Sequence, residues 1–266
     1  MIAHNFISSN PKISVKFCGQ GDLILFLHGI GGNKNNWNDN LQYFSKDFLS
    51  VAWDTRGYGE SDDYDGPLKF EDVVEDLKKV ITHFKKTSAH IVGLSMGGQI
   101  ACLFYQKYPS FVKSLVLCDT HFGLSKLDKN QVNAFIESRK KPLLNGFEPK
   151  DIALNVSKSL IGDTTNKVAL EKLVESISIL HKESYLKTID ASFMCSHEEV
   201  FKLIEKPTLI IVGEKDSLTP VSMSKNINKL IRNSKLKIIK KVGHLTNIEN
   251  PEEFNKIVFN FLKNMT

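Results

Sequence analysis

The chain has 266 residues, 41% of them hydrophobic, and 35 Lys and Arg against 30 Asp and Glu give a formal charge of +5. This length suits one large α/β domain with room for an inserted subdomain. The basic residues are scattered, in clusters no denser than pairs such as Lys85-Lys86, so we expect a solvated surface rather than a nucleic-acid-binding stripe. The sequence has no run of 18 uninterrupted apolar residues and no signal-peptide pattern, so we expect neither a membrane span nor secretion.

Short apolar runs recur along the chain, most of them ending at a polar residue or a glycine. Continuous runs of this kind are typical of strands buried on both faces of a mostly parallel sheet. Strands are predicted at residues 13–17, 23–27, 48–53, 89–94, 112–118, 207–212 and 236–240.

Amphipathic patterns lie between these strands. Apolar residues at three-and-four spacing predict a helix over Phe70–Phe84, and further helices are predicted at 99–108, 222–231 and 251–262. The last helix has Asn250 as its N-cap and Glu253 in place for a capping box. Strands alternating with helices predict a doubly wound α/β sheet.

The interval 120–205 breaks this alternation, because it holds helical stretches and no convincing buried strand. An insertion of this length within a sheet normally serves function as a lid or cap. We therefore predict a core domain formed by residues 1–119 and 206–266, and a helical cap formed by residues 120–205. Helices within the cap are predicted at 129–139, 151–160, 168–181 and 184–193.

Ser95 is the strongest candidate for a reactive residue. The pattern Gly93-x-Ser95-x-Gly97 follows a predicted strand and opens a predicted helix. A tight turn of this kind needs small neighbours, and it lifts the hydroxyl above the sheet at a helix N-terminus. We predict that Ser95 is a nucleophile.

A serine nucleophile needs a base and an orienting acid. His244 follows the last predicted strand, on the edge of the sheet where ligands collect in open α/β folds. Asp216 follows the preceding strand and is predicted to hold the imidazole in the right tautomer. Asp119, at the end of the strand before the cap, is the rival acid; Asp216 is favoured because its place fits the chain order Ser, Asp, His.

The segment HGIGG at 28–32 follows the first core strand. Glycines there allow a backbone N–H group to turn toward the site, and the N–H groups of Ile30 and Met96 are predicted to form an oxyanion hole. His28 is expected to bond to the loop backbone. The segment DTRGYGES at 54–61 is interpreted as structural, with Asp54 and Arg56 tying loops together.

The four cysteines show no CxxC pair and no spacing typical of metal ligands, so a reduced, cytoplasmic protein is the simplest expectation. No metal site and no organic cofactor are predicted. The expected partner is a small-molecule ester or lactone, and the oligomeric state stays open.

Taken together, the motifs resemble the α/β-hydrolase family over essentially the whole chain. HGIGG, DTRGYGESD, GLSMGG, GEKDSLTP and GHLTNIENPEEF appear in the family's order and spacing. DTRGYGES and GLSMGG look most like the branch of 3-oxoadipate enol-lactonases and carboxylesterases. Ser95 argues against haloalkane dehalogenases and epoxide hydrolases, which carry Asp there. Gly31-Gly32 and Leu94 argue against the meta-cleavage carbon–carbon hydrolases.

These observations predict a serine hydrolase that cleaves a carboxylic ester or lactone through an acyl-enzyme. A carbon–carbon bond hydrolase or a cofactor-free perhydrolase with the same triad, and a ligand-binding receptor on this fold, remain alternatives. The natural substrate stays open, although the apolar residues of the cap suit an apolar or mid-sized acyl group. These residues are Phe122, Leu124, Phe135, Ile136, Leu143, Leu144, Phe193 and Met194.

Overall fold

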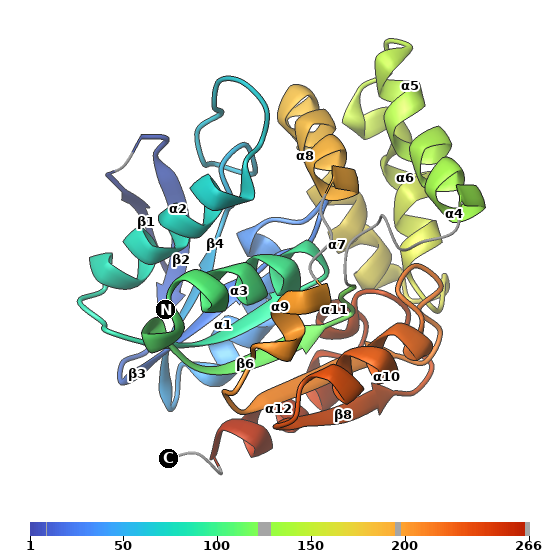
Figure 1. Ribbon diagram of the computed structural model, residues 1–266. Coiled ribbons are helices and arrows are strands. Elements are labelled where there is room, and N and C mark those ends of the chain that lie inside the picture. The colour runs from blue at the N-terminus through green and yellow to red at the C-terminus, as the bar shows by residue number, and fades with distance from the viewer. Residues whose placement is uncertain (9, 122–128, 195–197, 264–266) are drawn as a thin grey trace.

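An eight-stranded sheet runs through the centre of the computed structural model, which describes residues 1–8, 10–121, 129–194 and 198–263 (Figure 1). The strands follow the order β1-β2-β4-β3-β5-β6-β7-β8. β2 is antiparallel to β1 and β4, and all other neighbours are parallel, which confirms the predicted α/β sheet. The strands are β1 (Ala3–Ile7), β2 (Ile13–Cys18), β3 (Asp22–Leu27), β4 (Phe48–Trp53), β5 (Ala89–Leu94), β6 (Val112–Cys118), β7 (Thr208–Gly213) and β8 (Ser234–Ile239).

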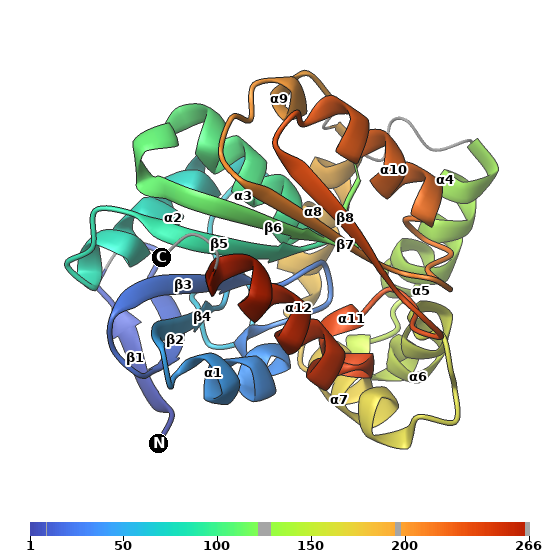
Figure 2. The ribbon, with the colours of Figure 1, turned by 90° about the horizontal axis from the view of Figure 1, so that it is seen from below.

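Helices cover both faces of the sheet (Figure 2). One layer consists of α2 (Phe70–His83), α3 (Met96–Lys107), α9 (Glu198–Lys202) and α10 (Val221–Leu230), and the other of α1 (Asn38–Phe44) and α12 (Pro251–Lys263). Each layer buries its own apolar cluster against the sheet. Asn250 caps α12 as predicted, since Glu253 N donates to Asn250 Oδ1 at 3.1 Å. The reciprocal half of the predicted capping box differs, because Glu253 Oε2 accepts from Asn250 Nδ2 at 3.1 Å while the backbone N–H of Asn250 donates to Thr246 O.

Between β6 and β7 a group of helices lies together at one edge of the sheet, at the upper right of Figure 1. They share a separate apolar cluster that includes Phe135, Leu143 and Tyr185, and Tyr58 of the core joins it. α9 also lies within the predicted cap interval 120–205, but it packs with α3 in the layer that covers the sheet. The division into a core and a cap at 120–205 therefore stays a proposal. The helices of the group are α4 (Lys129–Phe135), α5 (Lys141–Leu144), α6 (Pro149–Leu160), α7 (Lys167–Ser178) and α8 (Lys182–Met194).

Several features differ from the sequence expectation, which lacks the helices α1, α5 and α9. The first strand, β1, is not predicted, because it buries only Ile7 and carries no continuous apolar run. The helix expected over 129–139 is α-helical only to Phe135 and continues as a π-helical turn over Ile136–Lys140. Pro142 lies just beyond this turn and has no N–H to donate to Ser138, which disrupts regular α-helical hydrogen bonding here.

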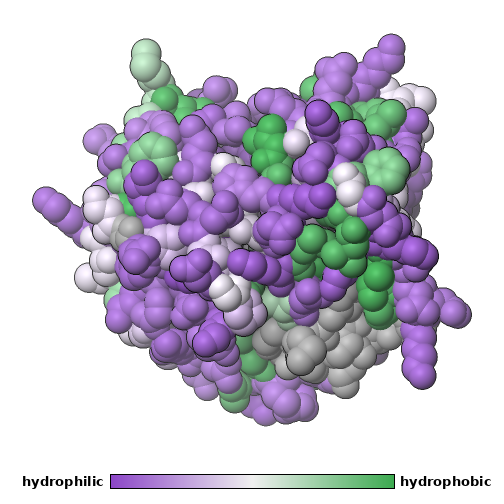
Figure 3. Space-filling model, turned by 90° about the horizontal axis from the view of Figure 1, so that it is seen from above, coloured by the Kyte–Doolittle hydropathy of each residue, from purple (hydrophilic) through white to green (hydrophobic). Residues whose placement is uncertain are grey.

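The outer surface is largely hydrophilic on the face shown in Figure 3, with small separate hydrophobic groups. Among the helices of the described residues, none combines the length and the apolar character needed to cross a membrane.

Phe254→Ala should lower the free energy of unfolding by about 3–5 kcal/mol, because it empties a fully buried site. Phe254 is 0% exposed and its ring lies 6.1 Å from that of Trp37. Phe147→Ala is the control, since Phe147 is 54% exposed, and it should change stability by less than about 0.5 kcal/mol. Urea denaturation measures both values, and equal effects would contradict the described packing of α12.

Candidate active site

Ser95 occupies a sharp turn between β5 and α3. Its backbone angles are φ 53° and ψ −114°, a conformation that is strained for any residue with a side chain. A methyl group at Gly93 would overlap the backbone of Gly97, and one at Gly97 would overlap the backbone of Leu27. The turn is held because Ser95 N donates to Cys118 O at 2.8 Å and Thr120 Oγ1 donates to Ser95 O at 2.7 Å. The sequence pattern of small residues around Ser95 therefore reflects a steric need.

His244 and Asp216 meet on the same edge of the sheet, on the loops that follow β8 and β7. His244 Nδ1 lies 2.9 Å from Asp216 Oδ2, and both side chains are buried. The amides of Leu218 and Thr219 each donate to Asp216 Oδ1 at 2.9 Å, and Thr219 Oγ1 donates to Oδ2 at 2.6 Å. Donation from Nδ1 to the carboxylate leaves Nε2 as the proton-accepting nitrogen of the neutral ring.

The electrostatics of this pair favour a charged Asp216. Burial raises its pKa, but the charge of His244 and hydrogen bonds from His244 and Thr219 outweigh burial, and the pKa ends below its ordinary value. Burial lowers the pKa of His244, but the charge and hydrogen bond of Asp216 outweigh burial, and the pKa ends above its ordinary value. The carboxylate thus stabilises a protonated His244.

Asp119, the rival acid, is buried nearby in a different role. Its Oδ1 accepts from Gly213 N at 2.9 Å and its Oδ2 accepts from Thr246 Oγ1 at 2.6 Å. Burial and the neighbouring charge of Asp216 raise the pKa of Asp119 well above its ordinary value. Asp119 therefore joins the loop of Asp216 to the loop of His244, while the contact with Nδ1 of His244 comes from Asp216.

The loop after β3 lies against Ser95. Ile30 lines the same cavity as Ser95, and Met96 follows Ser95 as the first residue of α3. Gly31 has a φ of 86°, which favours glycine. His28 bonds to backbone, as predicted: its Nδ1 lies 2.9 Å from Gly29 O, and Thr55 N donates to its Nε2 at 3.0 Å.

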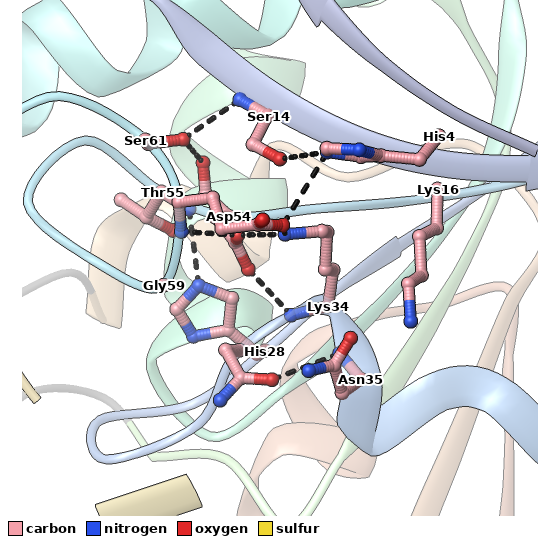
Figure 4. A network of polar contacts seen from close by, with 12 residues as sticks. His4, Ser14, Lys16, His28, Lys34, Asn35, Asp54, Thr55, Gly59 and Ser61 are labelled. Atoms are coloured by element: carbon pink, nitrogen blue, oxygen red, sulfur yellow. Dashed lines mark hydrogen bonds and ion pairs between the residues drawn. The ribbon is translucent and has the colours of Figure 1, made fainter. Parts of the chain in front are cut away.

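A polar network centred on the buried ion pair of Lys34 and Asp54 lies next to this loop (Figure 4). Lys34 Nζ lies 2.5 Å from Asp54 Oδ2 and 2.5 Å from Glu60 Oε2, and Lys34 N donates to Asp54 Oδ1 at 2.7 Å. Arg56 bonds to a different element, since its Nε donates to Asp76 Oδ2 of α2 at 2.7 Å. The structural interpretation of DTRGYGES agrees with these contacts, because each charged group joins the segment to a neighbouring element.

Two narrow cavities meet at Ser95, with volumes of about 20 Å³ and about 30 Å³. Each volume accommodates no more than a few water molecules. The first, called the apolar lobe, is walled by Trp37, Leu94 and Leu245 of the core and by Leu173 of α7. The second, called the cap lobe, is walled by His121, Phe135, Arg139, Val156, Tyr185 and Leu218. Both lobes share Ile30, Gly31, Ser95, Leu160, Ile177 and His244.

The apolar cap residues predicted from the sequence have different places. Phe135 lines the cap lobe, Leu143 is buried in the cap cluster, and Leu144 is 63% exposed. Phe122 and Leu124 lie outside the described residues, as do the side chains of Phe193 and Met194. Residues lining the cavities that the sequence did not single out include Arg139, Leu160, Ile177 and Tyr185.

The described residues contain no group of three or more His, Cys, Asp or Glu side chains placed to hold a metal ion. The side chains around the cavities include the Ser95 hydroxyl, the Arg139 guanidinium and the His244 imidazole, which pairs with a carboxylate.

A family model described as the alpha/beta hydrolase fold matches residues 22–251. The chain belongs to this family. It is 30% identical over 261 residues to the serine hydrolase BPHL of Mus musculus, a match that covers 92% of this chain and 81% of the relative. It is 26% identical over 262 residues to a pyrrolizixenacetamide deacetylase of Xenorhabdus hominickii, covering 93% and 94% of the two chains.

Further similarity extends to enol-lactonases and solved esterases. The chain is 24% identical over 244 residues to 3-oxoadipate enol-lactonase 2 of Acinetobacter baylyi, covering 90% of this chain and 89% of the relative. A thermophilic esterase from Thermogutta terrifontis superposes with a TM-score of 0.86 at 23% identity, covering 100% and 99% of the two chains. The enol-lactonase from Burkholderia xenovorans LB400 superposes with a TM-score of 0.85 at 20% identity, covering 97% and 100%. These structures show the same fold.

The raised pKa of His244 leads to a test by NMR titration of the labelled imidazole. His244 should titrate above the ordinary histidine value of about 6.5, and Asp216→Asn should lower its pKa because the stabilising negative charge is removed. Asp119→Asn is the control and should lower it less, because Asp216 acts on the imidazole through both its charge and a hydrogen bond, whereas Asp119 acts through its charge alone. A larger decrease in Asp119→Asn than in Asp216→Asn would contradict the assignment of charge.

Proposed function

We propose that this chain is a serine hydrolase that cleaves a carboxylic ester or lactone through an acyl-enzyme. The proposal is supported above all by the 2.9 Å contact between His244 Nδ1 and Asp216 Oδ2, next to a cavity that Ser95 and His244 both line. Membership of the alpha/beta hydrolase family supports it, as do relatives named as a serine hydrolase, a deacetylase and an enol-lactonase.

In the first half of the reaction, His244 Nε2 removes the proton of the Ser95 hydroxyl as the oxygen attacks the carbonyl carbon. Asp216 holds the ring and stabilises the imidazolium. The N–H groups of Ile30 and Met96 donate to the oxyanion of the tetrahedral intermediate. When the intermediate collapses, the bond to the alcohol oxygen breaks and His244 gives that oxygen its proton.

In the second half, a water molecule attacks the acyl-enzyme and His244 Nε2 accepts its proton. The second tetrahedral intermediate collapses, the acid leaves, and the proton returns to Ser95. The same groups therefore serve twice, and no metal or organic cofactor takes part in the proposed steps. With a lactone, the alcohol and the acid leave as one molecule.

Ser95→Ala should lower kcat/KM for p-nitrophenyl acetate and butyrate by about four powers of ten, because the nucleophile is removed. The exposed Ser217, on the loop of Asp216, provides the matched control, and Ser217→Ala should keep the parent rate. Circular dichroism verifies that both variants fold. Turnover that survives in Ser95→Ala would refute the nucleophile assignment.

Asp216→Asn should lower kcat by about 10⁴-fold, because an amide in place of the carboxylate favours the wrong imidazole tautomer. Asp119→Asn should have a much smaller effect, since its contacts are to Gly213 N and Thr246 rather than to the imidazole. Initial rates with the same esters measure both. If only Asp119→Asn abolished turnover, the acid would be Asp119.

A further inference from the structure

Arg139 is a buried cation in the wall of the candidate active site. It lies on the π-helical turn Ile136–Lys140 and is only 7% exposed. Its side chain helps to wall the cap lobe, which Ser95 and His244 also line. Its positive charge acts on the imidazole, where it opposes the rise in the pKa of His244.

The partners of Arg139 are neutral. Nη1 donates to Ser138 Oγ at 3.0 Å, Nη2 donates to Ser159 Oγ at 3.2 Å, and the guanidinium carbon lies 4.3 Å from the centre of the Phe135 ring. Within the described residues no carboxylate forms an ion pair with Arg139. A guanidinium has five N–H donors, so three remain without a protein acceptor among the described residues.

Neighbouring cations differ in this respect. Lys140 pairs with Asp190, Lys141 pairs with Glu137 at 2.8 Å, and the other buried arginine, Arg56, pairs with Asp76 at 2.7 Å. Arg139 is buried and lines a cavity with Ser95, and its hydrogen-bond partners are neutral. Within the part of the chain that the structure describes, the absence of an acid beside Arg139 is therefore a local property of the cap lobe.

This arrangement is costly unless an anion enters the lobe. A buried charge without a counter-ion is strongly unfavourable, and burial lowers the pKa of Arg139 accordingly. Tyr185 shares the lobe, but burial raises the pKa of its phenol, so it stays neutral and does not balance the charge. An anionic ligand would satisfy the free donors and compensate the burial of the guanidinium.

We propose that Arg139 binds a carboxylate carried by the substrate, so that the preferred substrates are esters or lactones with a free acid group. The planar guanidinium matches a carboxylate through two parallel N–H···O bonds. The carboxylate would then lie in the cap lobe, on the side of Ser95 that faces the helices between β6 and β7. The scissile carbonyl of the same substrate would lie next to Ser95. This inference rests on the proposed hydrolase function and names its substrate class.

The test uses two pairs of esters that differ in a carboxylate and its neutral amide. Mono-p-nitrophenyl glutarate and p-nitrophenyl 4-carbamoylbutanoate vary the acyl side, and 4-acetoxybutanoate and 4-acetoxybutanamide vary the alcohol side. In at least one pair the parent enzyme should prefer the carboxylate by about tenfold to hundredfold in kcat/KM, the range expected for a charge-assisted hydrogen bond.

Arg139→Gln should bring this ratio close to one, and Arg139→Lys should leave an intermediate ratio, because it keeps the charge and loses the fork. Lys140→Gln is the matched control on the same turn and should retain the full preference. Inhibition of the parent enzyme by glutarate but not by the uncharged diamide glutaramide gives a second measurement that needs no variant.

A parent enzyme without a preference in either pair, or a preference that survives in Arg139→Gln, would overturn the inference while leaving the hydrolase function intact. The proposed function itself fails only if no neutral or anionic ester is hydrolysed in a manner that depends on Ser95.

Discussion

The site depends on one steric constraint, the strained backbone of Ser95 between β5 and α3. The turn forms only because Gly93 and Gly97 leave room for the backbones of Gly97 and Leu27 to approach. Burial of the neighbouring strands offsets the strain, since every residue of β5 is buried. The consequence is a hydroxyl fixed at the edge of the sheet, which makes Ser95 the reference point for the other site residues.

The parallel sheet brings the remaining groups to that point. The loops after β6, β7 and β8 carry Asp119, Asp216 and His244, and parallel neighbours place their carboxyl ends at one edge. Asp119 then bonds to both of the other loops, and Glu249 accepts from the backbone N–H of Gly243 at 3.0 Å. On the opposite side the ion pair of Lys34 and Asp54 holds the loop of Ile30. Polar contacts between the loops, most of them buried, therefore hold the side chains of Asp216 and His244 in place before any substrate binds.

Most of this architecture is predictable from the sequence because it rests on local patterns. Continuous apolar runs predict β3 to β7, and the small residues around Ser95 reveal the turn. Other features depend on tertiary contacts that a pattern does not carry. The first strand, β1, forms by pairing with β2 while its side chains stay mostly exposed. Arg139 precedes two lysines in the sequence, and only the packing of the helices between β6 and β7 shows that it is buried beside the cavity.

The central claim is that Ser95 is a nucleophile activated by His244, and covalent labelling tests it most directly. A fluorophosphonate reacts with an activated serine and leaves a stable adduct whose position peptide mass spectrometry identifies. The account predicts a single adduct on Ser95, formed rapidly in the parent protein and far more slowly in His244→Ala. An unlabelled Ser95, or labelling of equal rate without His244, would contradict it.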